Sequence, residues 1–352
     1  MRSLPGVRLG DFDYELPPDR IAQRPIEPRD AARLLVDRGS AGPEHRYVRD
    51  LPELLQPGDL LVLNDTKVIP ARLRLRRATG GAAEVLLLEP LDGARRHWEA
   101  LVRPARKLTS GEVLHAPSGE AVVTVGERTA AGDTFEVELS GSIDEPDEPD
   151  EPDVLDVLDR HGEMPLPPYI TTRLDEPDRY QTVYAREPGS AAAPTAGLHF
   201  TPELLEEIRG HGVRIEYVEL VVGLDTFRPI DTENPLDHRM HTERYLVPEV
   251  TAEACREAER VVAVGTTAVR ALESAAATGT RIGRTDLFIH RGFDWQVVDL
   301  MMTNFHLPRT TLLLMIDAFV GDRWRDLYET ALAADYRFLS FGDAMLLDRS
   351  AR

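Results

Sequence analysis

Four short polar segments in the C-terminal half hold most of the side chains whose types and spacing could do chemistry. Each sets His, Thr, Asn or Arg beside Gly or Pro, next to an apolar run; they are residues 194–201 (PTAGLHFT), 237–243 (DHRMHTE), 265–270 (GTTAVR) and 303–311 (TNFHLPRTT). Polar groups at the ends of regular elements can converge on one ligand. A single segment of this kind is ordinary turn chemistry, but four within about 120 residues predict an active site.

The histidines of these segments are candidates for acid–base chemistry, because an imidazole titrates near neutral pH. His199 follows Gly197, whose missing side chain lets the backbone approach a ligand; a histidine that only holds the turn is the structural alternative. His238, His241 and Glu243 have a spacing that resembles a set of metal ligands. A stretch rich in Pro, Asp and Asn precedes them, so no helix aligns them. We therefore favour an acid–base or hydrogen-bonding role over a metal site.

The run 261–267 (VVAVGTT) predicts a buried strand that ends in Gly-Thr-Thr and passes directly into a helix. Ligands of open α/β sheets bind at such strand ends, where helix N-termini present free N–H groups. We expect Thr266 and Thr267 to meet a carboxylate or a ribose hydroxyl there, with a plain helix cap as the alternative. The segment has neither the P-loop nor the GxGxxG pattern. One turn further on, Arg270 and Glu273 share a helix face and can pair with each other.

Length and composition limit the class of protein. At 352 residues the chain exceeds a usual single core, which predicts one large domain and a smaller one. No apolar run approaches the roughly 20 residues needed to cross a bilayer, and the start of the chain lacks the apolar stretch of a secretory signal. The single cysteine, Cys255, excludes an intramolecular disulfide and a cysteine-built zinc site. We expect a cytoplasmic protein that has no membrane partner.

The charge balance argues against a broad nucleic-acid surface. The formal net charge is −20, and such a chain as a whole repels polyanions. Seven of the carboxylates lie in residues 144–153 (DEPDEPDEPD), which predict a disordered acidic linker. Basic side chains gather instead at 67–77 (KVIPARLRLRR) and 103–107 (RPARK). These two clusters indicate either a confined phosphate-binding strip or an arginine-decorated strand face.

The apolar patterns predict two kinds of architecture. Short alternating runs between about 60 and 139, broken by Gly, Asp and Pro, are typical of a small antiparallel barrel or sandwich. Beyond the linker, helices and strands alternate, which is α/β organisation. There we predict a helix at 202–211 capped by Thr201, strands at 213–222, 261–265 and 286–290, and a helix at 267–277. The predicted fold is an α/β main domain (1–60 and 155–352) with an inserted small antiparallel β-barrel (61–143) and an acidic low-complexity linker (144–154).

Together with four further motifs, these segments resemble one family. The further motifs are 64–73 (NDTKVIPARL), 161–170 (HGEMPLPPYI), 180–184 (YQTVY) and 336–345 (YRFLSFGDAM). The chain is similar to the S-adenosylmethionine:tRNA ribosyltransferase-isomerases of queuosine biosynthesis, from Asp11 to about Leu347 and in the same order. The motifs are long, which makes the resemblance specific.

The resemblance implies a reaction and its partners. The ribosyl part of S-adenosylmethionine would move onto a 7-aminomethyl-7-deazaguanine base at the wobble position of tRNA, giving epoxyqueuosine, adenine and methionine. S-adenosylmethionine would be a co-substrate, with no resident cofactor or metal. The target nucleotide would have to leave the base stack to reach a pocket, where an aromatic side chain supports it.

Roles for individual residues follow as predictions from that chemistry. We expect His199, His238 or His241 to act as base or acid. The predicted substrate contacts are Thr195, Gly197, Glu243, Gly265, Thr266, Thr267, Arg270, Asn304 and His306, with Arg270 on the methionine carboxylate and Tyr169 or Phe305 as the stacking surface. The predicted tRNA contacts are Lys67, Arg72, Arg74, Arg76, Arg77, Arg103, Arg106 and Lys107.

The sequence departs from the family pattern at two positions. The family usually has Leu-His-Val-Gly before a Gly-Thr-Phe; here Val221 stands for the histidine and Asp225 for the second glycine. This leaves open a paralogue with altered or lost chemistry that only binds tRNA. A metal-dependent hydrolase built on His238, His241 and Glu243 is the other alternative.

Overall fold

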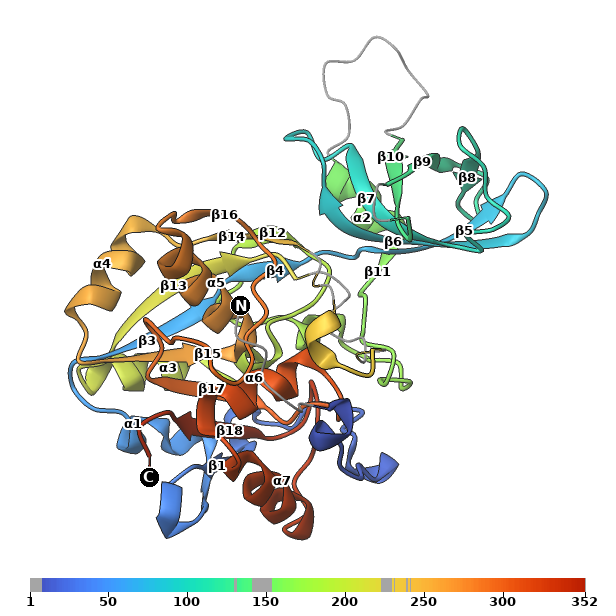
Figure 1. Ribbon diagram of the computed structural model, residues 1–352. Helices are drawn as coiled ribbons and strands as arrows, with labels where there is room; N and C mark the ends of the chain where they lie inside the picture. Colours follow the sequence, from blue (N-terminus) through green and yellow to red (C-terminus); the bar gives the residue numbers. More distant parts are fainter. Residues whose placement is uncertain are drawn as a thin grey trace.

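The computed structural model describes residues 8–129, 132–140, 154–222, 230, 232–238, 240 and 242–351. In these residues a large mixed sheet with helices on its faces carries a small barrel at one end (Figure 1). The predicted fold class, an α/β domain with an inserted antiparallel barrel, is confirmed. Residues 144–153 of the predicted acidic linker lie outside the described residues.

The main sheet has the strand order β16-β14-β13-β3-β15-β17-β18-β1-β2 in the part of the chain that the structure describes. Its strands are β1 (Arg33–Val36), β2 (Glu44–Tyr47), β3 (Asp59–Asn64), β13 (Arg214–Leu220), β14 (Glu243–Leu246), β15 (Arg260–Val264), β16 (Ile282–Thr285), β17 (Leu300–Asn304) and β18 (Ala344–Asp348). The central strands β13, β3, β15 and β17 are parallel, whereas β18 is antiparallel to β17. The carboxyl ends of the central strands therefore meet at one edge.

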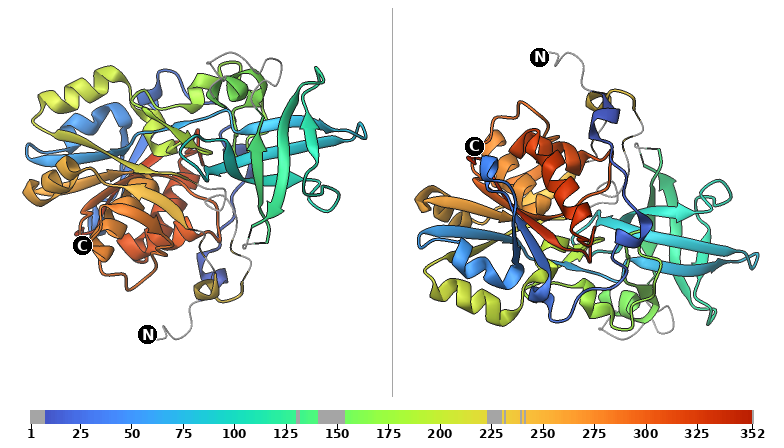
Figure 2. Two further views of the ribbon diagram at one scale, coloured as in Figure 1. Left: turned by 90° about the horizontal axis from the view of Figure 1, so that it is seen from above. Right: turned by 90° about the horizontal axis from the view of Figure 1, so that it is seen from below.

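The central strands are covered on both faces, which explains their continuous apolar runs. In β3, Leu60 and Val62 belong to one core and Leu61 and Leu63 to the other, as the two-residue period of a strand requires. The first core packs α4 (Glu249–Glu257), α5 (Gly265–Thr278), α6 (Thr311–Val320) and α7 (Arg323–Ala333) on the sheet; the second packs α1 (Leu51–Leu54) and α3 (Pro202–Gly210). Figure 2 shows these helices on opposite sides of the sheet.

The barrel strands lie in the spatial order β5-β6-β7-β10-β9-β8, and pairing of β5 with β8 closes the barrel. Its strands are β5 (Arg72–Arg77), β6 (Ala82–Pro90), β7 (His97–Arg103), β8 (Val113–His115), β9 (Ala121–Arg128) and β10 (Phe135–Leu139), all paired antiparallel. Leu73, Val85 and Val102 are in register and point inward, and helix α2 (Val154–His161) adds Leu158 to the same core. The arginines that flank Leu73 consequently point outward.

The two sheets are joined by short extended segments. The predicted start of the barrel, residue 61, falls inside β3 at the centre of the main sheet. Next come β4 (Thr66–Val68), which pairs with β12 (Glu187–Ser190), and then β5 of the barrel; the chain returns through α2 and β11 (Gly162–Glu163). The change of sheet thus lies between Val68 and Arg72. In the residues described, no helix is both long and apolar enough to cross a bilayer.

Most of the predicted elements near the polar segments are confirmed. Strands β13 and β15 and helices α3 and α5 lie where they were expected, and the Thr201 hydroxyl accepts a hydrogen bond from the Leu204 N–H (3.1 Å) at the start of α3. The strand predicted at 286–290 is wrong. The chain leaves β16 after Thr285, whose Oγ1 accepts a hydrogen bond from the Leu287 N–H (3.0 Å), and the next residues form no strand.

Candidate active site

A cleft lies at the carboxyl ends of the central parallel strands. The chain leaves β15 at Gly265 and β17 at Asn304, and both residues line the cleft, as does Val222 just beyond β13. Gly265 has a φ of +86°, a backbone conformation that favours glycine and here turns the strand directly into α5. The space between its walls, including the open mouth, is about 620 Å³.

Segments distant in the sequence converge on this cleft. Its wall contains most of the predicted substrate-binding residues, namely Tyr169, Thr195, Gly265, Thr266, Thr267, Asn304, Phe305 and His306. Leu339 and Ser340, from the motif at 336–345, complete the wall. The polar segments at 194–201, 265–270 and 303–311 therefore share one site, as the sequence predicted, although the chemical roles of their side chains remain predictions.

Hydrogen bonds within the wall fix several of these side chains. The Thr195 hydroxyl donates to Oδ1 of Asn304 (2.9 Å), and Nδ2 of Asn304 donates to the Leu339 carbonyl (3.2 Å). The hydroxyls of Tyr169 and Ser340 are 2.7 Å apart. Burial raises the pKa of Tyr169 to about 12, so its hydroxyl stays protonated at neutral pH. These bonds connect three separate segments and give the wall a preorganised shape.

The two aromatic candidates for the stacking surface differ in how deeply they are buried. Phe305 is completely buried, and its ring packs 4.7 Å from that of Phe338 and 5.4 Å from that of Tyr328, centroid to centroid. Tyr169 is only partly buried and lies in the cleft wall. The structure therefore argues against Phe305 as a stacking surface, because its ring is fully buried among core aromatic rings.

His306 lies in the wall as a neutral imidazole. Its Nε2 is 3.0 Å from the Thr303 hydroxyl, and its backbone N–H donates to the Tyr328 hydroxyl (3.0 Å). Burial lowers the pKa of His306 to about 3. At neutral pH the ring carries no charge, so it suits hydrogen bonding to a substrate better than proton storage.

A second lobe of about 370 Å³ adjoins the first and shares Thr266, Thr267 and Leu312 with it. Its remaining lining is mostly apolar and consists of Met240, Arg270, Leu287, Phe288, Ile289, Thr311 and Met315. Nη1 of Arg270 is paired with the Glu243 carboxylate, and both side chains are almost fully buried. Nε and Nη2 of Arg270 and the Thr267 hydroxyl are buried and make no hydrogen bond within the part of the chain that the structure describes.

The predicted pairing of Arg270 with Glu273 is wrong. The Glu273 carboxylate is completely buried and accepts hydrogen bonds from the backbone N–H groups of Gln296 (3.0 Å), Val297 (3.0 Å) and Val298 (2.9 Å). Residues three apart on a helix can pair, but here the tertiary structure gives each side chain another partner. Glu273 anchors the segment before β17, and Arg270 is left to face the cleft.

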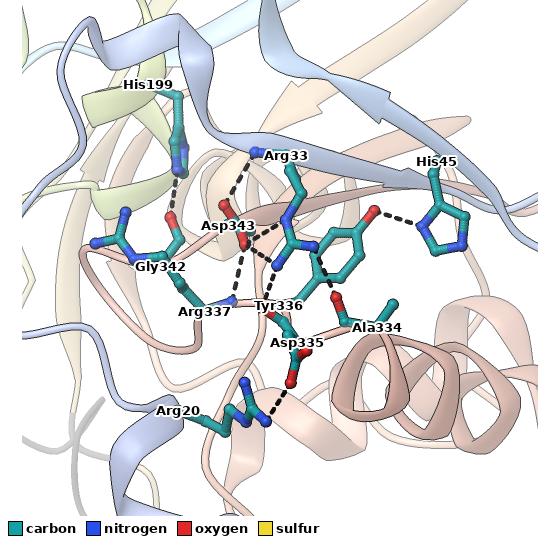
Figure 3. Close-up of polar contacts among 10 residues, drawn as sticks. All are labelled: Arg20, Arg33, His45, His199, Ala334, Asp335, Tyr336, Arg337, Gly342 and Asp343. Atoms are coloured by element: carbon teal, nitrogen blue, oxygen red, sulfur yellow. Dashed lines mark hydrogen bonds and ion pairs between the residues drawn. The ribbon is translucent and has the colours of Figure 1, made fainter.

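His199 does not line the cleft. Its Nδ1 is 3.0 Å from the Ala196 carbonyl and its Nε2 is 2.8 Å from the Gly342 carbonyl. Figure 3 shows the second contact, and beside it the Asp343 carboxylate, which accepts hydrogen bonds from Arg33 and from the Arg337 backbone. Burial lowers the pKa of His199. The geometry supports the structural alternative, in which the ring joins two segments that carry cleft-wall residues.

Gly197 has a packing role rather than a place in the cleft wall. A Cβ at this position would lie 1.9 Å from the Tyr184 hydroxyl and 3.0 Å from Cγ2 of Thr182. Any side chain would therefore displace Tyr184, which is buried. The close approach that the glycine permits is to protein and not, as predicted, to a ligand.

The segment 237–243 borders the second lobe. The His238 ring lies edge-on to Phe288, with 6.3 Å between ring centroids, and Phe288 lines the lobe. His241 is outside the described residues. Glu243 is ion-paired with Arg270. Among the described residues no group of three or more acidic, His or Cys side chains could hold a metal ion.

Sequence reasoning missed the apolar wall of the second lobe. Leu287, Phe288 and Ile289 were predicted as part of a strand, and Met240 and Met315 carried no polar signal. An apolar run indicates burial but does not distinguish a core from a ligand pocket. The one available signal was position, since the run follows a strand and precedes two polar residues, His290 and Arg291.

The two departures from the family pattern lie beside this cleft. Val221 is buried, and its N–H donates to the Arg244 carbonyl (3.0 Å). Its side chain is not part of the cleft lining, whereas that of the next residue, Val222, is. Asp225 lies outside the described residues.

The predicted tRNA contacts form two groups on and next to the barrel. Arg72, Arg74 and Arg77 are each paired with a carboxylate, Glu84 (4.0 Å), Glu163 (2.9 Å) and Glu112 (2.7 Å) respectively. Lys67, Arg76, Arg103, Arg106 and Lys107 are exposed and make no ion pair with any described residue. The second group therefore presents more of its charge to solvent.

A mixed sheet with a two-lobed cleft at the carboxyl ends of its parallel strands, and a barrel inserted beside it, defines a two-domain α/β protein with a built small-molecule site. The chain belongs to the queuosine biosynthesis protein family, whose model matches residues 9–347. This confirms the family that the sequence motifs indicated.

Individual relatives agree over nearly the whole chain. A protein of Rubrobacter xylanophilus named S-adenosylmethionine:tRNA ribosyltransferase-isomerase is 52% identical, covering 97% of this chain and 98% of its own. One of the same name from Symbiobacterium thermophilum is 50% identical over 97% of this chain and all of its own. The solved structure of an S-adenosylmethionine tRNA ribosyltransferase from Thermotoga maritima is 38% identical, covers 96% of this chain and 99% of its own, and superposes with a TM-score of 0.53.

Proposed function

We propose that this chain is an S-adenosylmethionine:tRNA ribosyltransferase-isomerase that acts on 7-aminomethyl-7-deazaguanine at the wobble position of tRNA. One observation carries the proposal. Polar segments that resemble the family motifs line a single cleft at the strand ends of an α/β sheet. The names of the relatives support the same activity, because they match this chain almost from end to end.

The proposed reaction balances as follows. A positively charged sulfur makes the adjacent 5′ carbon acidic, so a base removes a proton there; the bond to adenine breaks, and the adenine takes up a proton. A ring carbon–oxygen bond of the ribose breaks, and the aminomethyl nitrogen of the tRNA base forms a new bond to the ribosyl fragment and loses a proton. A new carbon–carbon bond then closes a five-membered carbocycle. Closure of the epoxide breaks the carbon–sulfur bond and releases methionine. One proton in total is released, which balances the charge of the sulfonium.

The first lobe suits the nucleoside and the incoming base. Thr195 and Asn304 are held by hydrogen bonds in its wall and offer polar edges to a ribose or an adenine. Neutral His306 can donate or accept a hydrogen bond there without bringing charge next to a sulfonium. We assign Tyr169 to the everted base, which it would support with its ring face.

His238 is our candidate for the proton-transfer step among the described histidines. Both ring nitrogens of His199 contact backbone carbonyls and Nε2 of His306 contacts the Thr303 hydroxyl, whereas His238 follows the short turn η9 (Pro235–Asp237) and lies beside a wall residue of the second lobe. A ring in that position can reach a proton near the junction of the lobes after a small loop movement. Hydrogen bonds of catalytic groups are commonly long without substrate and reach their short distances only in the substrate complex.

The activity is tested by incubating the protein with S-adenosylmethionine and tRNA that carries the aminomethyl base, followed by nucleoside mass spectrometry. We expect one epoxyqueuosine per adenine released, and no adenine with a control tRNA that carries guanine at the wobble position. Binding of the modified tRNA without adenine release would contradict the proposal and favour the binding-only paralogue.

Single histidine variants test the assignment of the proton-transfer group. We expect His238→Ala to lower the rate of adenine release at least about 100-fold, because general acid–base groups contribute roughly 10²–10⁴ in rate. His238→Phe, which keeps the contact with Phe288, should be equally slow. A His238→Ala rate within threefold of the unaltered protein would transfer the role to another residue, with His241 the first to test.

A further inference from the structure

The Nε–Nη2 edge of an arginine is used repeatedly in this protein to hold a carboxylate. Among the described residues, four arginines place these two nitrogens on the two different oxygens of one carboxylate: Arg77 on Glu112 (2.7 and 3.0 Å), Arg260 on Asp59 (2.8 and 2.6 Å), Arg291 on Asp317 (3.0 and 2.6 Å) and Arg323 on Asp37 (3.3 and 2.9 Å). Two parallel N–H donors match the two carboxylate oxygens, which makes this the strongest and most directional pairing of arginine.

In Arg270 the same edge is buried and has no partner. The side chain is 6% exposed, and Glu243 takes only Nη1, on the opposite side of the guanidinium group. Nε and Nη2 make no hydrogen bond with any described residue. Leaving charged donors unpaired away from water is unfavourable by several kcal/mol in general. A ligand that offers two acceptor oxygens would remove that cost.

The surroundings of this edge resemble a binding site more than a core. Arg270 lines the second lobe, and the Thr267 hydroxyl in the same lobe is also buried without a partner. Opposite these polar atoms lie Phe288, Leu312 and Met315, which offer an apolar wall. A carboxylate on a short apolar stem has the matching chemistry.

We propose that the second lobe is a carboxylate subsite, in which the Nε–Nη2 edge of Arg270 and the hydroxyl of Thr267 hold the amino-acid end of the sulfonium substrate. The identity of the ligand rests on the proposed function; the carboxylate chemistry rests on the geometry alone. The nucleoside then occupies the first lobe, and the sulfur lies near Thr266 and Thr267, the residues common to both lobes.

Glu243 is the positioning residue of this subsite. Its carboxylate holds Nη1 of Arg270, which fixes the plane of the guanidinium group and leaves the Nε–Nη2 edge available to a ligand. It also offsets part of the cation's charge, so the site recognises a carboxylate by shape as well as by charge. Both residues come from elements that the main sheet holds together, α5 and β14.

The test compares two ligands that differ only in the carboxylate. Binding of S-adenosylmethionine and of its decarboxylated analogue is measured by calorimetry for the unaltered protein, Arg270→Gln and Arg270→Lys. We expect Arg270→Gln to weaken S-adenosylmethionine about 50-fold and the decarboxylated analogue less than about threefold, since a bidentate charged pair is lost in only one case. Arg270→Lys should lose most of the same discrimination. Equal effects on both ligands, or none, would overturn the proposal.

Glu243→Gln separates positioning from simple support of the fold. The subsite predicts that it also lowers the preference for the carboxylate-bearing ligand, by about tenfold, while thermal melting confirms a folded protein. A purely structural role would weaken both ligands alike, and that result would remove Glu243 from the subsite. The surface variant Arg256→Gln is the matched control, and it should leave both affinities unchanged.

Competition experiments on the unaltered protein remain decisive if the variants do not fold. Free methionine should displace S-adenosylmethionine, whereas methioninol and 3-methylthiopropylamine should not. Displacement by inorganic phosphate at the same concentration as methionine would refute a carboxylate subsite in favour of a phosphate one. The proposed function fails separately, if S-adenosylmethionine binds with this preference but yields no adenine with the modified tRNA.

Discussion

At the scale of single residues, burial controls the charge of the groups around the cleft. His306 is neutral because burial lowers its pKa to about 3, and Tyr169 keeps its proton because burial raises its pKa to about 12. Asp65 shows the same effect on an acid. It follows β3 directly, and burial, followed by the nearby Glu219, raises its pKa to about 6, against the partial compensation of Arg186.

The raised pKa of Asp65 predicts a pH dependence of stability. An unfolded Asp titrates near 3.9, so the folded state binds more protons between roughly pH 4 and pH 6. The folded state is therefore destabilised as the pH rises through this window, and the full loss is present above about pH 6. Asp65→Asn should raise the free energy of unfolding at pH 7 by about 2 kcal/mol and leave it nearly unchanged at pH 4.

Urea unfolding at pH 4, 5, 6 and 7 measures this difference. The exposed Asp19→Asn serves as the matched control, for which we expect a difference from the unaltered protein that does not vary with pH. If the free energies of unfolding of Asp65→Asn and the unaltered protein differ by the same amount at all four pH values, ionisation of Asp65 does not destabilise the folded state.

At the scale of elements, helix α5 connects the site to the core. Its first residues, Gly265, Thr266 and Thr267, form part of the cleft wall, Arg270 follows one turn later, and Glu273 holds the chain on the opposite side. Three backbone N–H groups donate to the buried Glu273 carboxylate. The helix is thus fixed to the segment that leads into β17, the next strand that lines the cleft.

Loss of the Glu273 carboxylate should destabilise the whole domain. Glu273→Ala removes the shared acceptor of three backbone N–H groups, and we expect the free energy of unfolding to fall by about 3 kcal/mol or more. Glu253→Ala, at an exposed position of α4, is the comparison and should change it by less than about 0.5 kcal/mol. Chemical denaturation followed by circular dichroism gives both values. Similar values for the two variants would show that water satisfies the three N–H groups.

At the scale of the whole molecule, the acidic chain must approach a polyanion. The net charge of −20 opposes tRNA binding, and in the barrel several arginines are already neutralised by glutamates. Arg74, Glu84 and Arg103 are in register on the outer face of the barrel, and Arg76 lies on the same face of β5. The unpaired arginines on that face provide the available positive charge.

Charge reversal at these arginines tests the tRNA face. We expect the double variant Arg76→Glu/Arg103→Glu to weaken tRNA binding at least tenfold and to reduce the slope of log affinity against log salt by about 1–2, because fewer counterions are released. Arg77→Glu would break the pair with Glu112 and is unsuitable as a control. Arg256→Glu is suitable, because this residue of α4 lies on the main domain, is exposed and makes no ion pair with any described residue. Filter binding at several salt concentrations provides the slopes. Unchanged affinity and slope would move the tRNA face elsewhere.

The sequence by itself determined the architecture and the location of the chemistry. Continuous apolar runs predicted the two-sided burial of strands such as β15, alternating runs predicted the barrel, and Thr201 marked the start of α3. The convergence of the polar segments could be predicted because the carboxyl ends of parallel strands meet at one edge of the sheet, whatever their order in the sequence. These features are local, so a single sequence carries them.

Only the tertiary structure decided which of the candidate side chains line the cleft. Helical spacing allowed Arg270 to pair with Glu273, but long-range contacts gave Glu273 three backbone donors and Arg270 a partner 27 residues away. His199 had the right chemistry, yet both of its ring nitrogens contact carbonyls outside the cleft. Such choices depend on the burial of groups far apart in the chain, and a local pattern contains no information about that burial.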